Sequence, residues 1–543
     1  MGAMDMGFAK MHFKETSDAR LCEKRKQVYG LLKYVGIFFI YFLLEIKFLN
    51  DSWFPSDEQD IMQGGKALAR GFLLYRDYLS QHMPVSYYLS ALFELFGAYS
   101  VPLQRMAFYA FYSFMWTIIY IRYQSVVKKQ ILFFYPFCFV FVVSTYSMGT
   151  AILSEHLAGI GFLILFLEFL QFVQKKELKN GNCFMISIAI LLTFGTIFIA
   201  AFGVFVVALG VFAYELYVAA IMKTTLIGFF KKIWVKYWKL GVWIGMPWII
   251  YFTYLKLTGT FGHFYFSAYV MNRTIYSKYM GGLGSSILST VFGMLSNPAW
   301  IIQGVIPGEE YSVSILIQTI ISVLAIMYII YIFEKYGVIA GCTCVLFLMA
   351  LGIRGFYNFH GTQSVSILCF LAVCSFNDLL VGSKEIFNKR SSIYKTCIVW
   401  IVLIVSSVYI GGISRFAELT INDGENENAK MIALITERDE EVWNCTLSAE
   451  IFMQADRAGL YNVGAVPWIW EAHGERVLKE FKELPPRVAF FDREAEIWGH
   501  SVADYGKDLI KYIDLHFIRY QETGVYIRND YYKKAEKILS QID

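Results

Sequence analysis

Residues 131–148 read ILFFYPFCFVFVVSTYSM, a run of apolar and aromatic side chains without a charged group. A helix needs roughly 17 to 25 mostly apolar residues to cross ~30 Å of hydrocarbon. Inside a bilayer each backbone N–H and C=O must find its partner within the protein, which favours helices. A spanning barrel would show short alternating strands, and this run does not alternate. The stretch therefore predicts a membrane-spanning helix.

Similar runs recur through the first three quarters of the chain. The whole sequence is 57% hydrophobic and 17% charged, whereas soluble domains are about 45–50% apolar and about 25% charged. We therefore predict a multi-pass α-helical membrane protein with about eleven transmembrane helices. The predicted spans are 31–49, 104–121, 131–148, 155–173, 183–200, 203–221, 240–257, 311–333, 337–353, 361–381 and 395–414. The stretch 183–221 is also compatible with one span and a re-entrant segment, which would change the number of spans from odd to even.

The distribution of Lys and Arg predicts the orientation, because cytoplasmic loops hold an excess of both. Basic clusters occupy the N-terminal tail and every second loop, at 122–129, 175–179, 223–239, 335 and 384–395. We therefore predict a cell-membrane protein with a cytoplasmic N-terminus and an extracytoplasmic C-terminus. The predicted units are a cytoplasmic tail (1–30), a transmembrane domain (31–414) with long outside loops at 50–103 and 258–310, and an extracytoplasmic domain (415–543).

The C-terminal region has the composition of a small α/β domain. Residues 488–491 read VAFF after two prolines, which is typical of a buried strand. The segments 472–483 and 502–512 have the pattern of helices. The sequence thus predicts a folded domain outside the membrane.

The first outside loop holds most of the chemistry-bearing residues. From Phe54 to Arg105 it reads FPSDEQDIMQGGKALARGFLLYRDYLSQHMPVSYYLSALFELFGAYSVPLQR. Asp57 and Glu58 open a predicted interfacial helix that ends near Gly71. Acidic residues in a first turn complement the helix dipole, which is the structural interpretation. Charged groups held near lipid are costly and usually functional, which is the alternative.

The order of residues in this loop resembles a known family. It contains the pair Asp57-Glu58, the pattern A-x-x-x-G-x-x-x-Y-x-D from Ala67 to Asp77, H-x-P from His82, and then L-F-G and Arg105. This order is similar to the first outside loop of GT-C glycosyltransferases, especially the branch with protein O-mannosyltransferases and the lipid A aminoarabinose transferase. The resemblance implies a sugar donor on a polyprenyl phosphate, and inverting transfer to an extracytoplasmic glycan, lipid or protein.

The resemblance also implies roles for individual residues. Asp57 matches the catalytic aspartate, with Glu58 as its neighbour, so both are the predicted catalytic residues and Asp57 is the predicted base. Asp77 and His82 match the Y-x-D and H-x-P positions. The aminoarabinose transferases tend to have Lys near His82, so the loop is nearer the mannosyltransferase pattern there.

Further polar residues are candidates for binding the substrate. They are Asp77, His82, Arg105, Glu155, His156, Arg354, His360, Lys66 and Arg70. Arginine near a membrane surface can grip phosphate, although snorkelling at a span end is an equally ordinary role. Glu155 follows Ser154, so this pair also fits a plain helix start.

Two rival functions remain open at this point. A transporter or lipid flippase would bury ionisable residues near the membrane midplane and break its helices there, whereas the acids of this chain gather in an outside loop. A cell-wall polymerase or ligase would use the same lipid carrier. The sequence implies no cofactor, no residue set supports a divalent metal, and no nucleic-acid-binding motif is evident. The predicted partners are a polyprenyl-phosphate-linked sugar, an extracytoplasmic acceptor and membrane lipid.

Overall fold

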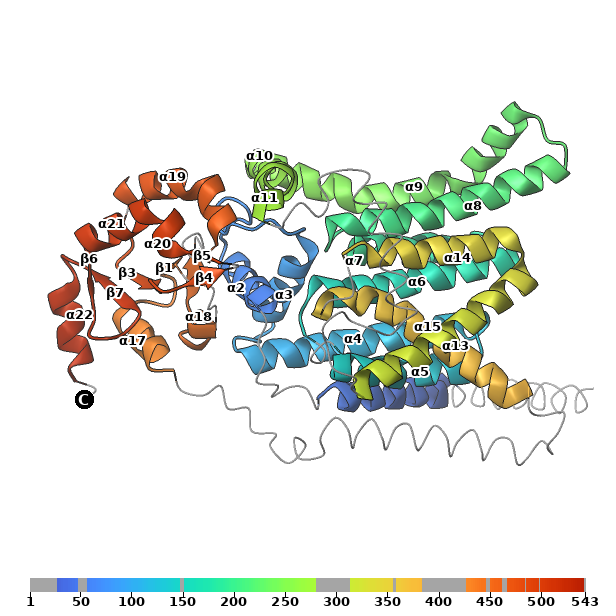
Figure 1. The fold of residues 1–543 in the computed structure, drawn as a ribbon, viewed down its shortest axis with the longest axis horizontal. Helices are drawn as coiled ribbons and strands as arrows, with labels where there is room; N and C mark the ends of the chain where they lie inside the picture. Colours follow the sequence, from blue (N-terminus) through green and yellow to red (C-terminus); the bar gives the residue numbers. More distant parts are fainter. Residues whose placement is uncertain are drawn as a thin grey trace, which may run out of the picture.

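The structure is a computed structural model that describes residues 27–46, 56–146, 151–279, 313–354, 358–382, 426–445, 450–460, 466–483, 485–497 and 499–541. Long helices run side by side in a bundle, and a domain built on a β-sheet lies at one end of it (Figure 1). Two short helices, α2 and α3, lie between the bundle and that domain.

The bundle helices overlap the predicted spans that fall within the described residues, with different bounds at several ends. They are Gln27–Ile46, α4 (Val101–Tyr123), α5 (Lys129–Tyr146), α6 (Ser154–Lys175), α7 (Asn180–Thr193), α8 (Ala201–Ile221), α9 (Leu226–Leu257), α13 (Val313–Tyr336), α14 (Val338–Leu351) and α15 (Thr362–Gly382). The short helix η1 (Phe198–Ala200) separates α7 from α8, so the stretch 183–221 forms two helices. The predicted span 395–414 lies outside the described residues.

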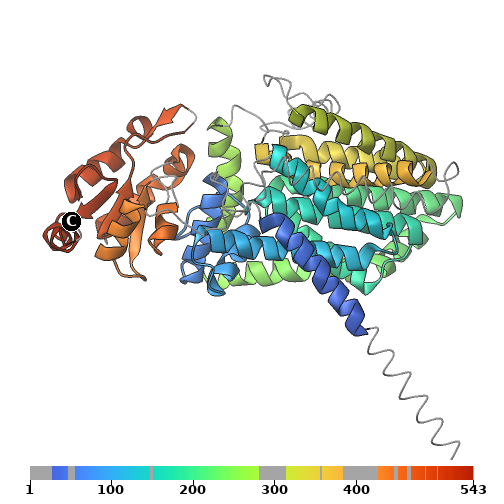
Figure 2. The same ribbon diagram turned by 90° about the horizontal axis from the view of Figure 1, so that it is seen from below.

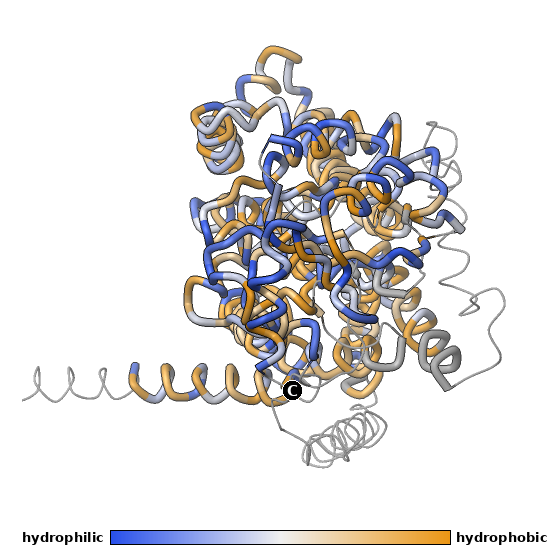
Figure 3. Tube along the Cα trace, turned by 90° about the vertical axis from the view of Figure 1, so that its left-hand side faces the viewer, coloured by the Kyte–Doolittle hydropathy of each residue, from blue (hydrophilic) through white to orange (hydrophobic). Residues whose placement is uncertain are grey.

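Among the described residues, five helices are long and apolar enough to cross a membrane: Gln27–Ile46, Ser154–Lys175, Phe198–Ile221, Leu226–Leu257 and Thr362–Leu380. The apolar helix Gln27–Ile46 runs obliquely along the outside of the bundle (Figure 2). Seen from the end that carries the sheet domain, hydrophilic segments lie in front and this helix is largely hydrophobic (Figure 3). Shorter apolar helices lie at Lys129–Val143, Asn180–Thr193 and Val338–Leu351.

Helix α9 begins earlier than the expected span 240–257. Its 32 residues include the basic segment 231–239, and at ~1.5 Å per residue they exceed the hydrocarbon thickness. The side chain of Thr225 accepts a hydrogen bond from the Gly228 N–H and caps the helix. Hydropathy detects only the apolar half of such a helix, because lysines leave helix formation intact while lowering the hydropathy.

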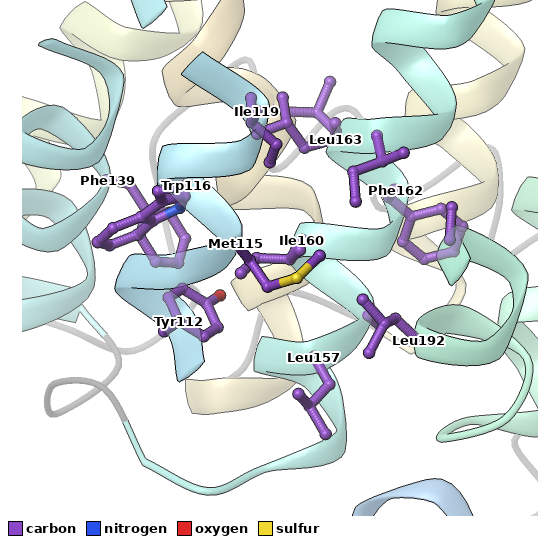
Figure 4. Packing of buried hydrophobic residues seen from close by; sticks show 14 of the residues in the cluster. Tyr112, Met115, Trp116, Ile119, Phe139, Leu157, Ile160, Phe162, Leu163 and Leu192 are labelled. Atoms are coloured by element: carbon purple, nitrogen blue, oxygen red, sulfur yellow. The ribbon is translucent and has the colours of Figure 1, made fainter. Parts of the chain in front are cut away.

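Helix α6 lies at the centre of the bundle, and 94% of its most apolar 18-residue stretch is buried. Figure 4 shows Leu157, Ile160 and Leu163 of this helix in the same buried cluster as Tyr112 and Trp116 of α4. Tyr112 and Trp116 of α4 meet edge to face with ring centroids 4.9 Å apart. Such packing, repeated through the core, holds the helix ends at fixed positions.

The C-terminal domain contains a five-stranded mixed sheet with the order β2-β1-β3-β7-β6. The strands are β1 (Glu441–Cys445), β2 (Ala458–Leu460), β3 (Val488–Phe491), β6 (Phe517–Arg519) and β7 (Val525–Arg528), and β4 (Glu496–Ile497) pairs with β5 (His500–Ser501). β1 lies parallel to β2 and β3, whereas β7 lies antiparallel to β3 and β6. The predicted strand 488–491 is β3.

Helices cover both faces of this sheet, because its strands are apolar on both sides. Trp443 and Phe491 belong to one cluster with residues of α19 (Pro467–Glu483) and α21 (Lys507–His516). Val442 and Phe490 belong to a second cluster. That second face is covered by α17 (Glu427–Ile435), α18 (Glu450–Gln454) and α22 (Tyr532–Leu539). The helix predicted at 472–483 is confirmed, and 502–512 falls in α20 (Val502–Tyr505) and α21.

Candidate active site

Helix α2 (Ser56–Ala69) brings the predicted catalytic acids to the end of the bundle. Asp57 and Glu58 lie in its first turn, as the sequence predicted. Gly71, with a φ of +90°, terminates the segment, since this backbone conformation is costly for any residue with a Cβ. Helix α3 (Val85–Leu95) packs against α2, and Gly97, at φ +96°, ends it in the same way.

Glu58 and Arg105 form a buried ion pair. The Arg105 guanidinium donates Nη2–H and Nε–H to the two carboxylate oxygens of Glu58, at 2.6 and 3.1 Å. The Ile152 N–H adds a third hydrogen bond at 3.0 Å, and Glu58 is 0% exposed. The pair joins the start of α2 to α4 and to the segment before α6. Arg105, predicted to bind substrate, here binds Glu58.

Asp57 is the more accessible of the two predicted catalytic residues. Its side chain is partly exposed, whereas that of Glu58 is enclosed. Consecutive helical residues point about 100° apart, so the Glu58–Arg105 pair can hold α2 while Asp57 faces another direction. Residues three apart share a helix face, which places Asp60 beside Asp57.

Asp60, which the sequence patterns did not single out, is the centre of a polar cluster. Its carboxylate accepts hydrogen bonds from the hydroxyls of Tyr78, at 2.8 Å, and Tyr87, and His82 Nδ1 lies 3.4 Å away. Burial raises the pKa of both phenols well above the usual value, and the Asp60 charge adds to the rise. Both tyrosines therefore stay protonated and donate. The only signal in the sequence was the i, i+3 spacing of two acids.

Tyr87, at the start of α3, connects this cluster to His82. The Tyr87 hydroxyl lies 3.1 Å from His82 Nδ1 and 2.6 Å from the Ser80 hydroxyl. The His82 N–H donates to Ser80 Oγ at 3.0 Å, and the His82 carbonyl accepts from the Tyr75 hydroxyl at 2.8 Å. His82 is thus held at both its backbone and its ring, and its side chain is 25% exposed.

Asp77 shapes the turn between α2 and α3. Its carboxylate accepts the Leu73 N–H at 2.9 Å and binds the neighbouring Arg76 guanidinium at 2.7 Å. Tyr75 in this turn has a φ of +70°, a conformation that needs such support. The contacts of Asp77 are those of a residue that stabilises the loop.

The acids of the first loop lie next to the start of α6. The Ser86 and Ser154 hydroxyls are 2.8 Å apart, and Glu155 accepts a hydrogen bond from, or forms an ion pair with, His360 Nδ1 at 3.0 Å. The His156 carbonyl accepts the Tyr112 hydroxyl at 2.8 Å, and His156 itself is buried. Glu155 and His360, predicted separately, are therefore one pair.

Arg354, also predicted to bind substrate, ends the helical turn η3 (Gly352–Arg354). This turn is close in sequence to η4 (Asn358–Gly361), which carries His360. The side chain of Arg354 lies outside the described part of the chain. Leu153 is the residue that precedes α6, so Ser154 is its first residue and not its cap. A cavity of about 240 Å³ beside α2 and α3 is mostly apolar, lined among others by Phe72 and Tyr254.

Lys66 and Arg70 connect α2 to the C-terminal domain. Lys66 Nζ lies 3.0 Å from Glu94 and 2.8 Å from Asp456, and Lys66 is 0% exposed. Arg70 binds the same Asp456 carboxylate at 2.5 Å, and Arg438 lies 2.7 Å from it. Burial alone would raise the pKa of Asp456, but the hydrogen bond and charge of Lys66, with Arg70 and Arg438, hold it below the usual value. Both candidates thus bind protein carboxylates.

The side chains of the described segments form no group of three or more His, Cys, Asp or Glu residues that could hold a metal ion. The described side chains include an accessible carboxylate at Asp57, an imidazole held in position at His82 and cations paired with carboxylates, near one end of the helical bundle. Such groups can orient a nucleophile, accept its proton and stabilise an anionic leaving group.

Comparison with known families and with curated proteins finds no match. Two solved structures from Archaeoglobus fulgidus are similar at a low level. The oligosaccharyltransferase AglB, in complex with an inhibitory peptide and a dolichol-phosphate, matches 93% of this chain and 75% of its own, with 12% identity and a TM-score of 0.47. An oligosaccharyltransferase in the apo form matches 85% and 70%, with 12% identity and a TM-score of 0.46. At this level of similarity neither structure bears on the activity of the chain.

Proposed function

We propose that this chain is an integral membrane glycosyltransferase of the GT-C type. It transfers a sugar from a polyprenyl-phosphate donor to an extracytoplasmic acceptor by inverting displacement. The observation that carries the proposal is the placement of Asp57. This carboxylate is partly exposed at the start of α2, next to a buried ion pair, where the apolar bundle meets the polar C-terminal domain.

This position suits a reaction between a lipid and a water-borne molecule. The polyprenyl tail requires an apolar environment, whereas the phosphate and sugar require a polar one, and both are present at this end of the bundle. A carboxylate near the anomeric carbon can orient or deprotonate the acceptor. Asp57 is the residue proposed for that contact, and Glu58 keeps α2 in place through Arg105.

The leaving phosphate requires positive charge. Lys66, Arg70 and Arg105 all contact carboxylates of the protein, which balance their charges, so they are not proposed as ligands of the phosphate. His360, on Glu155, and Arg354 remain the proposed direct contacts to phosphate. Fixed charges aimed at a developing anion lower the barrier without reorganisation.

The experiment is transfer by the purified full-length chain in nanodiscs, tested against a panel of polyprenyl-phosphate sugars. We expect wild-type transfer with at least one donor and a fall of about 10²- to 10⁴-fold in Asp57→Asn, the range for loss of acid–base or electrostatic assistance. Asp508→Asn on the exposed surface of α21 is the matched control. Full activity of Asp57→Asn would remove this residue from the mechanism.

The same preparation separates the alternatives. Movement of a solute or lipid across liposomes without sugar transfer would favour a transporter or flippase, and polymer formation would favour a cell-wall polymerase or ligase.

The proposed topology places the C-terminus outside. An epitope after Asp543 should therefore be labelled on intact cells, and labelling only after permeabilisation would reverse the topology.

A further inference from the structure

The hydrogen bonds around Tyr87 determine which nitrogen of His82 carries a proton. A phenol has one hydrogen to donate, and Tyr87 gives it to the Asp60 carboxylate. The 3.1 Å contact between the Tyr87 oxygen and His82 Nδ1 therefore needs a hydrogen from the imidazole. The Asp60 carboxylate, 3.4 Å from the same nitrogen, can also only accept. Both neighbours thus place the proton on Nδ1.

The other side of the ring leads to the same assignment. The Trp468 indole N–H, which can only donate, points at Gln81 Oε1 at 3.3 Å. This fixes the orientation of the Gln81 amide and turns its NH₂ group towards His82 Nε2, at 3.4 Å. An amide NH₂ donates, so Nε2 is the accepting nitrogen. At this distance the hydrogen bond is weak and easily displaced.

His82 lies where three extracytoplasmic parts of the proposed enzyme meet. Gln81, its neighbour, accepts a hydrogen bond from Trp468 of α19 and another, at its carbonyl, from Asn272 of η2 (Phe266–Tyr276) at 2.9 Å. Asp60, the partner of His82, lies one turn along α2 from Asp57. An acceptor held by Asp57 would therefore be within the neighbourhood of His82.

We propose that Nε2 of His82 is the proton acceptor of the transfer reaction, and that Asp60 and Tyr87 are its positioning residues. This inference rests on the proposed function and refines it. Asp57 then orients the acceptor. The acceptor oxygen or nitrogen bonds to the anomeric carbon as the bond from that carbon to the phosphate oxygen breaks, and that electron pair leaves with the polyprenyl phosphate. The acceptor proton moves to Nε2, Asp60 balances the imidazolium charge, and water later removes the proton.

The chemistry of the His82 and Asp57 side chains favours this division of roles, in which His82 accepts the proton and Asp57 orients the acceptor. A general base works best when it titrates near the working pH, which imidazole does and an ordinary carboxylate does not. The arrangement of a base whose second nitrogen is held by a carboxylate, directly or through a hydroxyl, also recurs in hydrolases. Here the Tyr87 hydroxyl and the Asp60 carboxylate hold His82 Nδ1.

The experiment uses His82→Ala, in full-length protein in nanodiscs, with the donor that wild type accepts. We expect transfer to fall about 10²- to 10⁴-fold and added imidazole to restore part of it, whereas Asp57→Asn gains nothing from imidazole. Asp60→Asn should keep part of the activity and displace the pH profile of kcat/KM. His516→Ala, on the exposed end of α21, is the matched control, and His82→Gln, with thermal unfolding, tests whether the fold survives.

Two outcomes overturn the inference while the proposed function stands. One is wild-type-like transfer by His82→Ala. The other is a folded but inactive His82 variant that imidazole does not rescue, together with an unchanged pH profile in Asp60→Asn. If wild type transfers no sugar from any donor, the proposed function fails and the assignment of His82 fails with it.

Discussion

The Glu58–Arg105 pair should act as a single structural unit, and Glu58→Gln tests this. Glutamine keeps the shape of the side chain and an oxygen for the Ile152 N–H, but it removes the charge and replaces the oxygen that accepts from Arg105 Nη2–H with an NH₂ donor. Both members are almost completely buried, at 0% and 4% side-chain exposure. Breaking such a pair leaves the other charge uncompensated and costs about 3–5 kcal/mol of the free energy of unfolding. Arg105→Met should cost a similar amount.

The double variant Glu58→Gln/Arg105→Met should lose less than the sum of the two single losses, because it leaves no unpaired charge. We expect a coupling energy of about 2–3 kcal/mol, at the upper end for residues in contact. The assay is unfolding in mixed detergent with increasing dodecyl sulfate, followed by tryptophan fluorescence. Additive losses, with a coupling below about 0.5 kcal/mol, would refute the conclusion that these two charges share one buried site.

Three further predictions concern the contacts between the bundle and the C-terminal domain. Asp456→Asn should lower the free energy of unfolding by about 1–3 kcal/mol, because Lys66 and Arg70 lose a charged partner; dodecyl sulfate unfolding beside Asp508→Asn measures it, and equal midpoints would contradict it. Lys66→Met should cost more, about 3–5 kcal/mol, because it leaves the Glu94 carboxylate buried; a smaller loss than that of Asp456→Asn would reverse this ranking. Burial, with Arg476 and His263, lowers the pKa of His473 from 6.5 to about 3, so the unfolded state binds more protons between these values. The contribution of neutral His473 to the free energy of unfolding is fully present above the unfolded pKa, and the free energy of unfolding should fall by about 2 kcal/mol between about pH 7.5 and about pH 5. His473→Phe should reduce this fall, and an identical pH dependence in that variant would exclude His473 as its cause.

Local features of the site could be predicted because they depend on short segments. The helix that Asp57 and Glu58 open and that ends before Gly71, and the strand 488–491, follow from capping acids, glycine positions and apolar runs. The partners of the charged residues could not be predicted. Lys66 and Arg70 bind Asp456, which lies far along the chain, and spacing within a helix contains no information about such contacts.

The amino-acid pattern alone was enough to predict apolar helices, an α/β domain and acids that gather in one loop. It was enough because hydrophobic burial and backbone hydrogen bonding act on each segment separately. The fold of the chain was needed to show that Arg105 encloses Glu58 and that Glu155 pairs with His360. It was also needed to show that Asp60 joins Tyr87 and His82 in one cluster. A buried charge takes whichever partner the packing brings within reach, and that choice is made only when the helices assemble.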